Sequence, residues 1–104
     1  MGSKTTLAAR DGATIGAYLA IPEGKPKAGL VVLQEIFGVN QHIREVTDGF
    51  AAAGYLAIAP ALFDRVERNA ELGYAEADMG KARALRGAVD PAAAMLDIEA
   101  AVEA

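Results

Sequence analysis

The chain has 104 residues, of which 53% are hydrophobic and 23% charged, and its net charge at pH 7 is −4. This composition suits one small globular domain and offers no basic surface for nucleic acid. The chain lacks cysteine, a signal-peptide core and any apolar run long enough to cross a bilayer, so we expect a cytoplasmic protein with neither disulfides nor a membrane partner.

A hairpin is predicted first. Residues 4–10 and 13–21 flank Asp11-Gly12, a pair that favours a tight turn, and the second segment alternates apolar with less apolar positions. After a polar loop, residues 28–36 (AGLVVLQEI) form an almost continuous apolar run. Such a run is typical of a parallel strand that is covered on both faces.

A helix and a second short strand follow. Asn40 is a good N-cap, and Gly54 lies where a helix would end. Between them one helical face is predicted to be buried, and it carries Ile43, Val46, Thr47 and Phe50. Residues 55–59 then form an apolar strand before Pro60, which completes a strand–helix–strand unit with parallel strands.

The last third is predicted to be an irregular loop followed by two helices. The loop covers residues 61–70, and apolar spacing over 72–85 indicates the first helix. Asp90-Pro91 is a suitable start for the second. Its buried face is expected to carry Met95, Ile98 and Val102. Because no strand follows this helix, we expect the chain to be part of a longer α/β domain.

Glu35 is the main candidate for chemistry. It ends the most apolar strand, and ligands of open α/β sheets bind beyond the carboxyl ends of the strands. A half-buried carboxylate there can transfer protons, although a solvated or capping glutamate would fit the position equally well. The backbone N–H of Ile36 could stabilise an oxyanion, or the turn could be an ordinary one.

Other candidates are weaker. Arg65 could bind a substrate carboxylate or could pair with Asp64 or Glu67. Lys81 and Arg83 lie on the polar side of a predicted helix, so solvation is the simpler interpretation. His42, the only histidine, has no second ligand for a metal site and is best explained as a surface residue. No G-x-S-x-G, G-x-G-x-x-G or Walker A sequence occurs, so neither a serine nucleophile nor a cofactor is predicted.

Several segments resemble the dienelactone hydrolase family. They are residues 33–40 (LQEIFGVN), 43–48 (IREVTD), 53–57 (AGYLA), 59–63 (APALF) and 97–101 (DIEAA). The resemblance covers essentially the whole chain but only the first half of a family member. It implies that residues 1–104 form the N-terminal part of one α/β-hydrolase domain, with a mostly parallel sheet and flanking helices.

The resemblance also implies a function. The family cleaves cyclic enol-lactones or related esters with a Cys-His-Asp triad that would lie outside this chain, so the isolated chain is expected to be inactive. Glu35 matches the glutamate that partners the cysteine, and Ile36 matches an oxyanion donor. Phe37, Arg65, Lys81 and Arg83 are expected to contact substrate. Ala61 departs from the family's usual aspartate.

A non-catalytic interpretation remains open. Without a neighbouring strand, residues 29–36 would expose an apolar sheet edge, which invites pairing with another strand. The expected partners are therefore a second copy of the chain or a separate C-terminal half.

Overall fold

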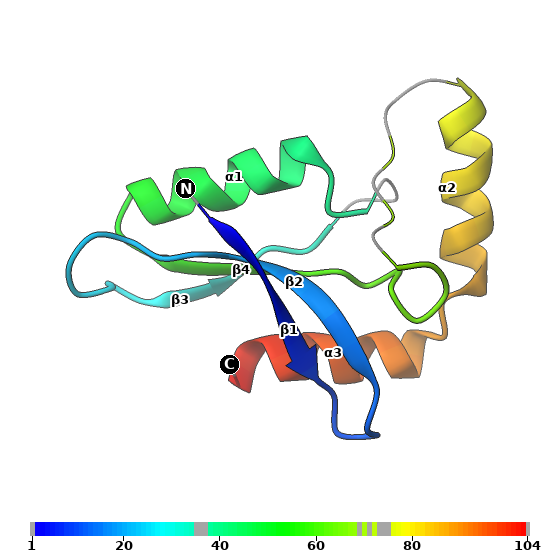
Figure 1. Cartoon of the computed structure of the whole chain (residues 1–104), viewed down its shortest axis with the longest axis horizontal. Coiled ribbons are helices and arrows are strands. Elements are labelled where there is room, and N and C mark those ends of the chain that lie inside the picture. The colour runs from blue at the N-terminus through cyan, green and yellow to red at the C-terminus, as the bar shows by residue number, and fades with distance from the viewer. Residues whose placement is uncertain (1, 35–37, 69, 71, 73–75, 104) are drawn as a thin grey trace.

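The computed structural model describes residues 2–34, 38–68, 70, 72 and 76–103. Its strands form one four-stranded sheet with helices on both faces (Figure 1). The elements are β1 (Ser3–Ala8), β2 (Thr14–Ala20), β3 (Gly29–Val31), α1 (Gln41–Ala52), β4 (Leu56–Pro60), α2 (Glu76–Ala88) and α3 (Pro91–Glu103). None of the helices in this part of the chain is both long and apolar enough to span a bilayer.

The sheet has the order β1-β2-β4-β3 and is mixed. β1 and β2 form the predicted hairpin around Asp11-Gly12, and β3 and β4 form the predicted parallel pair. β2, however, runs antiparallel to both of its neighbours. Among the described strands β1, β4 and β3 therefore run in one direction and only β2 opposes them, which agrees with the expected α/β-hydrolase architecture of a sheet with flanking helices.

β3 is shorter than predicted. Regular pairing covers residues 29–31, and the N–H of Val32 donates one further bond to the carbonyl of Ile58 at 2.8 Å. Residues 35 and 36, which complete the predicted strand, lie outside the described residues, as does residue 37. Among the residues that are described, β3 pairs with β4 only, so its other edge is open.

α1 packs on one face of the sheet as its sequence predicts. The Asn40 side chain accepts the N–H of Ile43 at 3.2 Å, which confirms the N-cap. Ile43 and Thr47 are buried, and the Thr47 hydroxyl donates to the carbonyl of Ile43 at 2.7 Å. Phe50, also predicted to be buried, is 39% exposed and instead lies edge-to-face on Tyr55.

α3 covers the opposite face with a different side from the one predicted. Met95 and Val102 are 62% and 67% exposed, whereas Asp97 is fully buried and Ala101 is 3% exposed. The small Ala101 packs directly on Leu7 and Ile58 of the sheet. An ion pair described below holds Asp97 in the interior, and this explains the rotation of the helix relative to its apolar pattern.

α2 lies at one end of the sheet and packs on the segment that follows β4 (Figure 1). The predicted helix over 72–85 begins at Glu76 in the structure. Leu72 precedes it but is still buried, in a cluster with Phe63, Ala70, Ala82 and Leu85. This cluster fixes the segment after β4 between α2 and the sheet.

Candidate functional site

The candidate site lies at the edge where β3 and β4 end. Because these strands are parallel, the segments that follow them meet at the same edge of the sheet. Glu35, Ile36 and Phe37 belong to the segment after β3 and lie outside the described residues. Their expected roles stay predictions, but the residues on either side of them are well defined.

Polar side chains anchor both flanks of residues 35–37. The side-chain oxygen of Gln34 accepts the N–H of Leu62 at 2.8 Å, which joins the segment after β3 to the one after β4. The Asn40 amide donates to the carbonyl of Leu72 at 3.0 Å in addition to capping α1. Gly38 has a φ of +80°, a conformation that favours glycine. Three residues of the LQEIFGVN segment are therefore fixed on the two sides of residues 35–37.

Arg65 is bound by two aspartates from distant parts of the chain. Its Nε and Nη2 donate to the Asp97 carboxylate at 2.8–3.1 Å, and its Nη1 and Nη2 donate to Asp11 at 2.7 and 3.0 Å. The sequence offered Asp64 or Glu67 as partners on the surface. The described hydrogen bonds of the Arg65 guanidinium go to Asp11 and Asp97 instead. Arg65 thus links the segment after β4 to α3 and to the β1–β2 turn.

Arg65 and Asp11 each stabilise the charged form of the other. The hydrogen bonds from Arg65 lower the pKa of Asp11 to about 2, and the two aspartates raise the pKa of Arg65. Asp11 and Arg65 are therefore both charged at neutral pH. Since most Arg65 donors are occupied, the structure gives this residue an anchoring role, and its contact with substrate stays a prediction.

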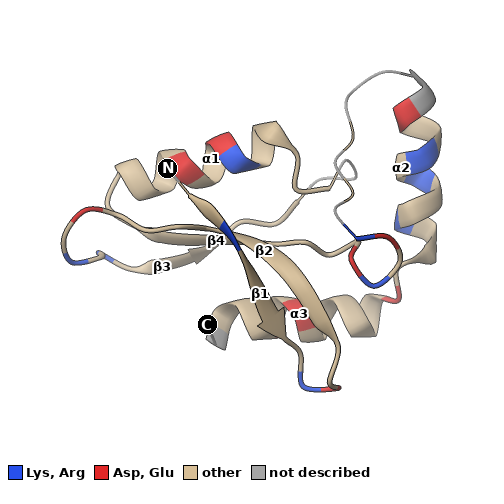
Figure 2. Ribbon diagram, in the orientation of Figure 1, with Lys and Arg blue, Asp and Glu red and all other residues tan. Residues whose placement is uncertain are grey.

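Several Lys and Arg residues lie along α2 (Figure 2), and Lys81, Arg83 and Arg86 are exposed. Lys81 is 2.9 Å from Glu67, and both side chains are about half exposed. Arg83 is exposed, as is His42 in the first turn of α1. These positions agree with solvated side chains, and substrate contacts by Lys81 and Arg83 remain untested predictions.

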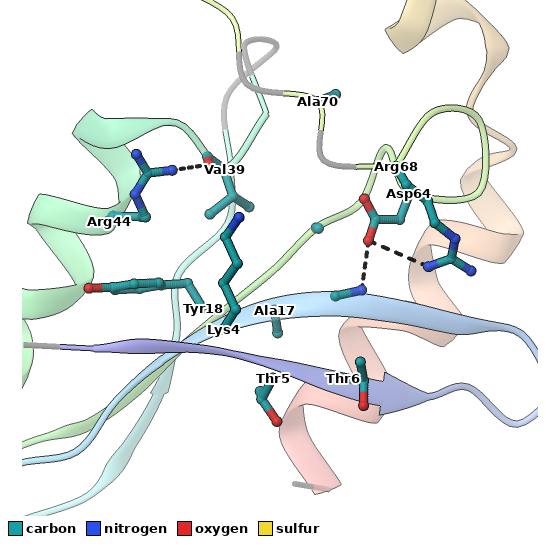
Figure 3. A pocket seen from close by; sticks show the side chains of 12 residues that line it. Lys4, Thr5, Thr6, Ala17, Tyr18, Val39, Arg44, Asp64, Arg68 and Ala70 are labelled. Atoms are coloured by element: carbon teal, nitrogen blue, oxygen red, sulfur yellow. Dashed lines mark hydrogen bonds and ion pairs between the residues drawn. The ribbon is translucent and has the colours of Figure 1, made fainter.

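A cavity of about 240 Å³ lies beside the anchored turn (Figure 3). Ala17 and Tyr18 of β2 line it. Val39 and Ala61, which belong to the segments after β3 and β4, line it as well. The rim carries Lys4, Arg44 and Arg68.

Asp64 lies in the same cavity wall and is almost completely buried. Its carboxylate accepts the N–H of Gly16 at 2.7 Å and lies 3.9 Å from an Arg68 nitrogen. A Cβ at Gly16 would be only 3.0 Å from that carboxylate, so a larger residue here would require the Asp64 side chain to shift. Sequence reasoning missed Gln34, Asp64 and Asp97 as anchors, because the groups that they hold, in Leu62, Gly16 and Arg65, lie far from them along the chain.

Comparisons with known proteins agree with this architecture. The sequence profile of the dienelactone hydrolase family matches residues 15–104. A protein of Synechocystis sp., provisionally named carboxymethylenebutenolidase, is 40% identical over 102 residues, which are 95% of this chain and 42% of the relative. The carboxymethylenebutenolidase of Pseudomonas putida is 37% identical over 93 residues, which are 88% of this chain and 39% of that enzyme.

A solved structure gives the same result. A provisionally assigned dienelactone hydrolase from Klebsiella pneumoniae superposes with a TM-score of 0.76 at 32% identity, over 95% of this chain and 40% of that protein. The chain therefore spans about two fifths of the length of these relatives and shares their α/β-hydrolase fold over that part. With a match to the family profile over residues 15–104, this chain belongs to the dienelactone hydrolase family.

Proposed function

We propose that this chain forms the glutamate-bearing part of an α/β-hydrolase domain that cleaves cyclic enol-lactones or related carboxylic esters. The observation that carries the proposal is the family match over residues 15–104, which includes Glu35 and its anchored flanks. The chain contains no cysteine, so the nucleophile has to come from additional polypeptide. The greater length of the relatives leaves room for it.

In the proposed mechanism, the thiolate of that polypeptide attacks the carbonyl carbon and forms an acyl-cysteine as the alkoxide or enolate leaves. Glu35 exchanges a proton with the cysteine and so sets the balance between thiol and thiolate. The N–H of Ile36 donates to the oxyanion of the tetrahedral intermediate. Phe37 and the cavity beside Val39 offer apolar surface for the body of the substrate.

Completion of the domain tests this proposal. We expect no hydrolysis of an enol-lactone or of an aryl ester by the chain alone, and hydrolysis once the remaining part of the Synechocystis relative is supplied, either fused or as a second polypeptide. The control is the same completed protein with its triad cysteine changed to alanine. A folded completed protein without activity, or activity of the chain alone, would contradict the proposal.

A second candidate is a non-catalytic protein that associates through β3. Its open edge lies beside a groove of about 460 Å³ whose apolar lining includes Leu19, Val31 and Ile58. Ile21 directly follows β2 and Leu33 lies shortly after β3, and both side chains are more than half exposed. Unpaired backbone groups next to apolar surface favour the addition of a strand from another chain.

We therefore expect the isolated chain to sediment as a dimer or larger species, and Leu33→Lys to shift it toward monomer because a charge at the edge opposes pairing. Val66→Lys, at a similarly exposed apolar residue after β4, is the matched control and should not change the mass. A monomer across the whole concentration series of the unmodified chain would reject association through this edge.

A further inference from the structure

The cavity of Figure 3 carries an excess of positive charge. Lys4, Arg44 and Arg68 line it together with one described carboxylate, that of Asp64. The three cations come from β1, from α1 and from the segment after β4, so they meet only in the folded protein. The whole chain, by contrast, has a net charge of −4. Cations that gather around a cavity raise the local concentration of anions there.

The carboxylate of Asp64 is already stabilised by its own neighbours. It accepts the N–H of Gly16 at 2.7 Å, and a nitrogen of Arg68 lies 3.9 Å away. Figure 3 shows Asp64 and Arg68 on one side of the cavity and Lys4 and Arg44 on the other. The positive charge that a ligand would meet therefore comes mainly from Lys4 and Arg44.

Arg44 is held at the cavity by a hydrogen bond. Its side chain is half-buried, and its Nη1 donates to the carbonyl of Val39 at 3.1 Å. It is the fourth residue of α1, close to the positive end of the helix dipole, where an anion is favourable and a cation is not. The carboxylate of Asp48, one turn further along α1, lies 2.9 Å from the Tyr18 hydroxyl and is not part of the cavity lining. An anion beside Arg44 would thus interact favourably with the guanidinium and with the helix end.

The rest of the lining is mostly apolar. It includes Ala17, Val39, Ala61 and Ala70. Small-molecule sites commonly combine such a lining with a few charged or polar groups that orient the ligand. The volume of about 240 Å³ is below the range of about 300–1,000 Å³ that is typical of sites for drug-sized ligands, so the cavity suits a compact ligand.

We propose that this cavity binds a small organic carboxylate, with its charge on Lys4 and Arg44 and its apolar body on Ala17, Val39 and Ala61. A guanidinium binds a carboxylate through paired N–H donors, and an ammonium adds a point charge. The mechanism proposed above uses this cavity only for apolar contact. Binding of the carboxylate involves no reacting group, so it is independent of whether the completed domain hydrolyses an ester.

NMR titration of the full, ¹⁵N-labelled chain with benzoate tests the proposal. Benzoate should shift the amide signals of Ala17, Val39 and Ala61 in a saturable way. It should bind about tenfold more tightly than benzamide, its neutral analogue, because only the carboxylate forms charge-assisted hydrogen bonds. Inorganic phosphate should bind more weakly than benzoate, because it leaves the apolar lining uncovered. Equal affinity for benzoate and benzamide, phosphate binding at least as tight as benzoate, or shifts confined to other parts of the chain would overturn the proposal.

Charge variants locate the carboxylate within the cavity. Arg44→Gln should raise the Kd for benzoate about tenfold, and Lys4→Gln, at an exposed residue, about two- to fivefold. Ala61→Asp, which adds a carboxylate to the wall without removing a cation, should also weaken benzoate binding and leave benzamide binding unchanged. Lys25→Gln, in the exposed loop before β3, is the matched control and should leave both affinities unchanged.

The two kinds of variant guard against a loss of fold. Circular dichroism shows whether Arg44→Gln keeps α1, and Ala61→Asp leaves the Arg44 bond to Val39 intact. Benzoate binding that is unchanged in Ala61→Asp, or that falls as much in Lys25→Gln as in Lys4→Gln, would reject this cavity as the carboxylate site.

Discussion

Replacing Arg65 with methionine should lower the free energy of unfolding by about 3–5 kcal/mol, because it leaves a fully buried Asp97 carboxylate without its cation. The cost is large relative to the total stability of about 5–15 kcal/mol that is typical of a small domain. Urea denaturation followed by circular dichroism measures it directly. Methionine keeps most of the volume of the side chain, so the loss reports the missing charge rather than a cavity.

Two further variants make this prediction specific. Arg83→Met removes an exposed arginine on α2 and should cost less than about 1 kcal/mol. The double variant Arg65→Met/Asp97→Leu also removes the buried Asp97 carboxylate that Arg65→Met leaves unpaired, so the stability should recover part of the loss. Unfolding of Arg65→Met at the same urea concentration as the unmodified chain would rule out an anchoring role.

Acid titration of the same proteins gives an independent check. Because the pKa of Asp11 falls from 3.8 to about 2 on folding, its contribution to stability is present above pH 3.8 and is lost as pH falls toward 2. Arg65 is the main cause of this shift. The decline in stability over this window should therefore be shallower in Arg65→Met than in the unmodified chain.

The parts of the fold that sequence predicts well depend on local signals. The hairpin follows from Asp11-Gly12, and α1 follows from the Asn40 cap and from Gly54, which has a φ of +101° at its end. The buried face of α3 was predicted wrongly, because an apolar pattern assigns every aspartate to solvent. Asp97 is buried only because Arg65, 32 residues earlier, reaches it in the folded chain.

The candidate site likewise has one part that local signals predict and another part that they do not. The LQEIFGVN segment could be found from its residues, and Asn40 was predicted as a cap. The bonds from Gln34 to Leu62 and from Asn40 to Leu72 could not, because they join segments about 30 residues apart that share no period or spacing. A motif therefore identified the turn, whereas only the fold shows what holds it.

Glu35→Gln in the completed hydrolase should lower kcat/KM for lactone cleavage by about 10²–10⁴-fold, the usual contribution of a residue that transfers a proton. Glutamine has the same shape but neither accepts nor returns a proton near neutral pH. The pH–rate profile should change with it, because the balance between thiol and thiolate would then depend on the cysteine and its remaining neighbours alone. Glu23→Gln, in the exposed loop before β3, is the matched control and should leave kcat/KM unchanged.

Stability distinguishes a chemical loss from a structural one in this variant. The residues that flank Glu35 in the sequence are held by the bonds from Leu62 to Gln34 and from Asn40 to Leu72, which Glu35→Gln leaves intact. The variant should therefore unfold at the same urea concentration as the parent while its rate falls. Hydrolysis at the parental rate would show that Glu35 takes no part in the reaction, and it would do so without calling the fold or the family assignment into question.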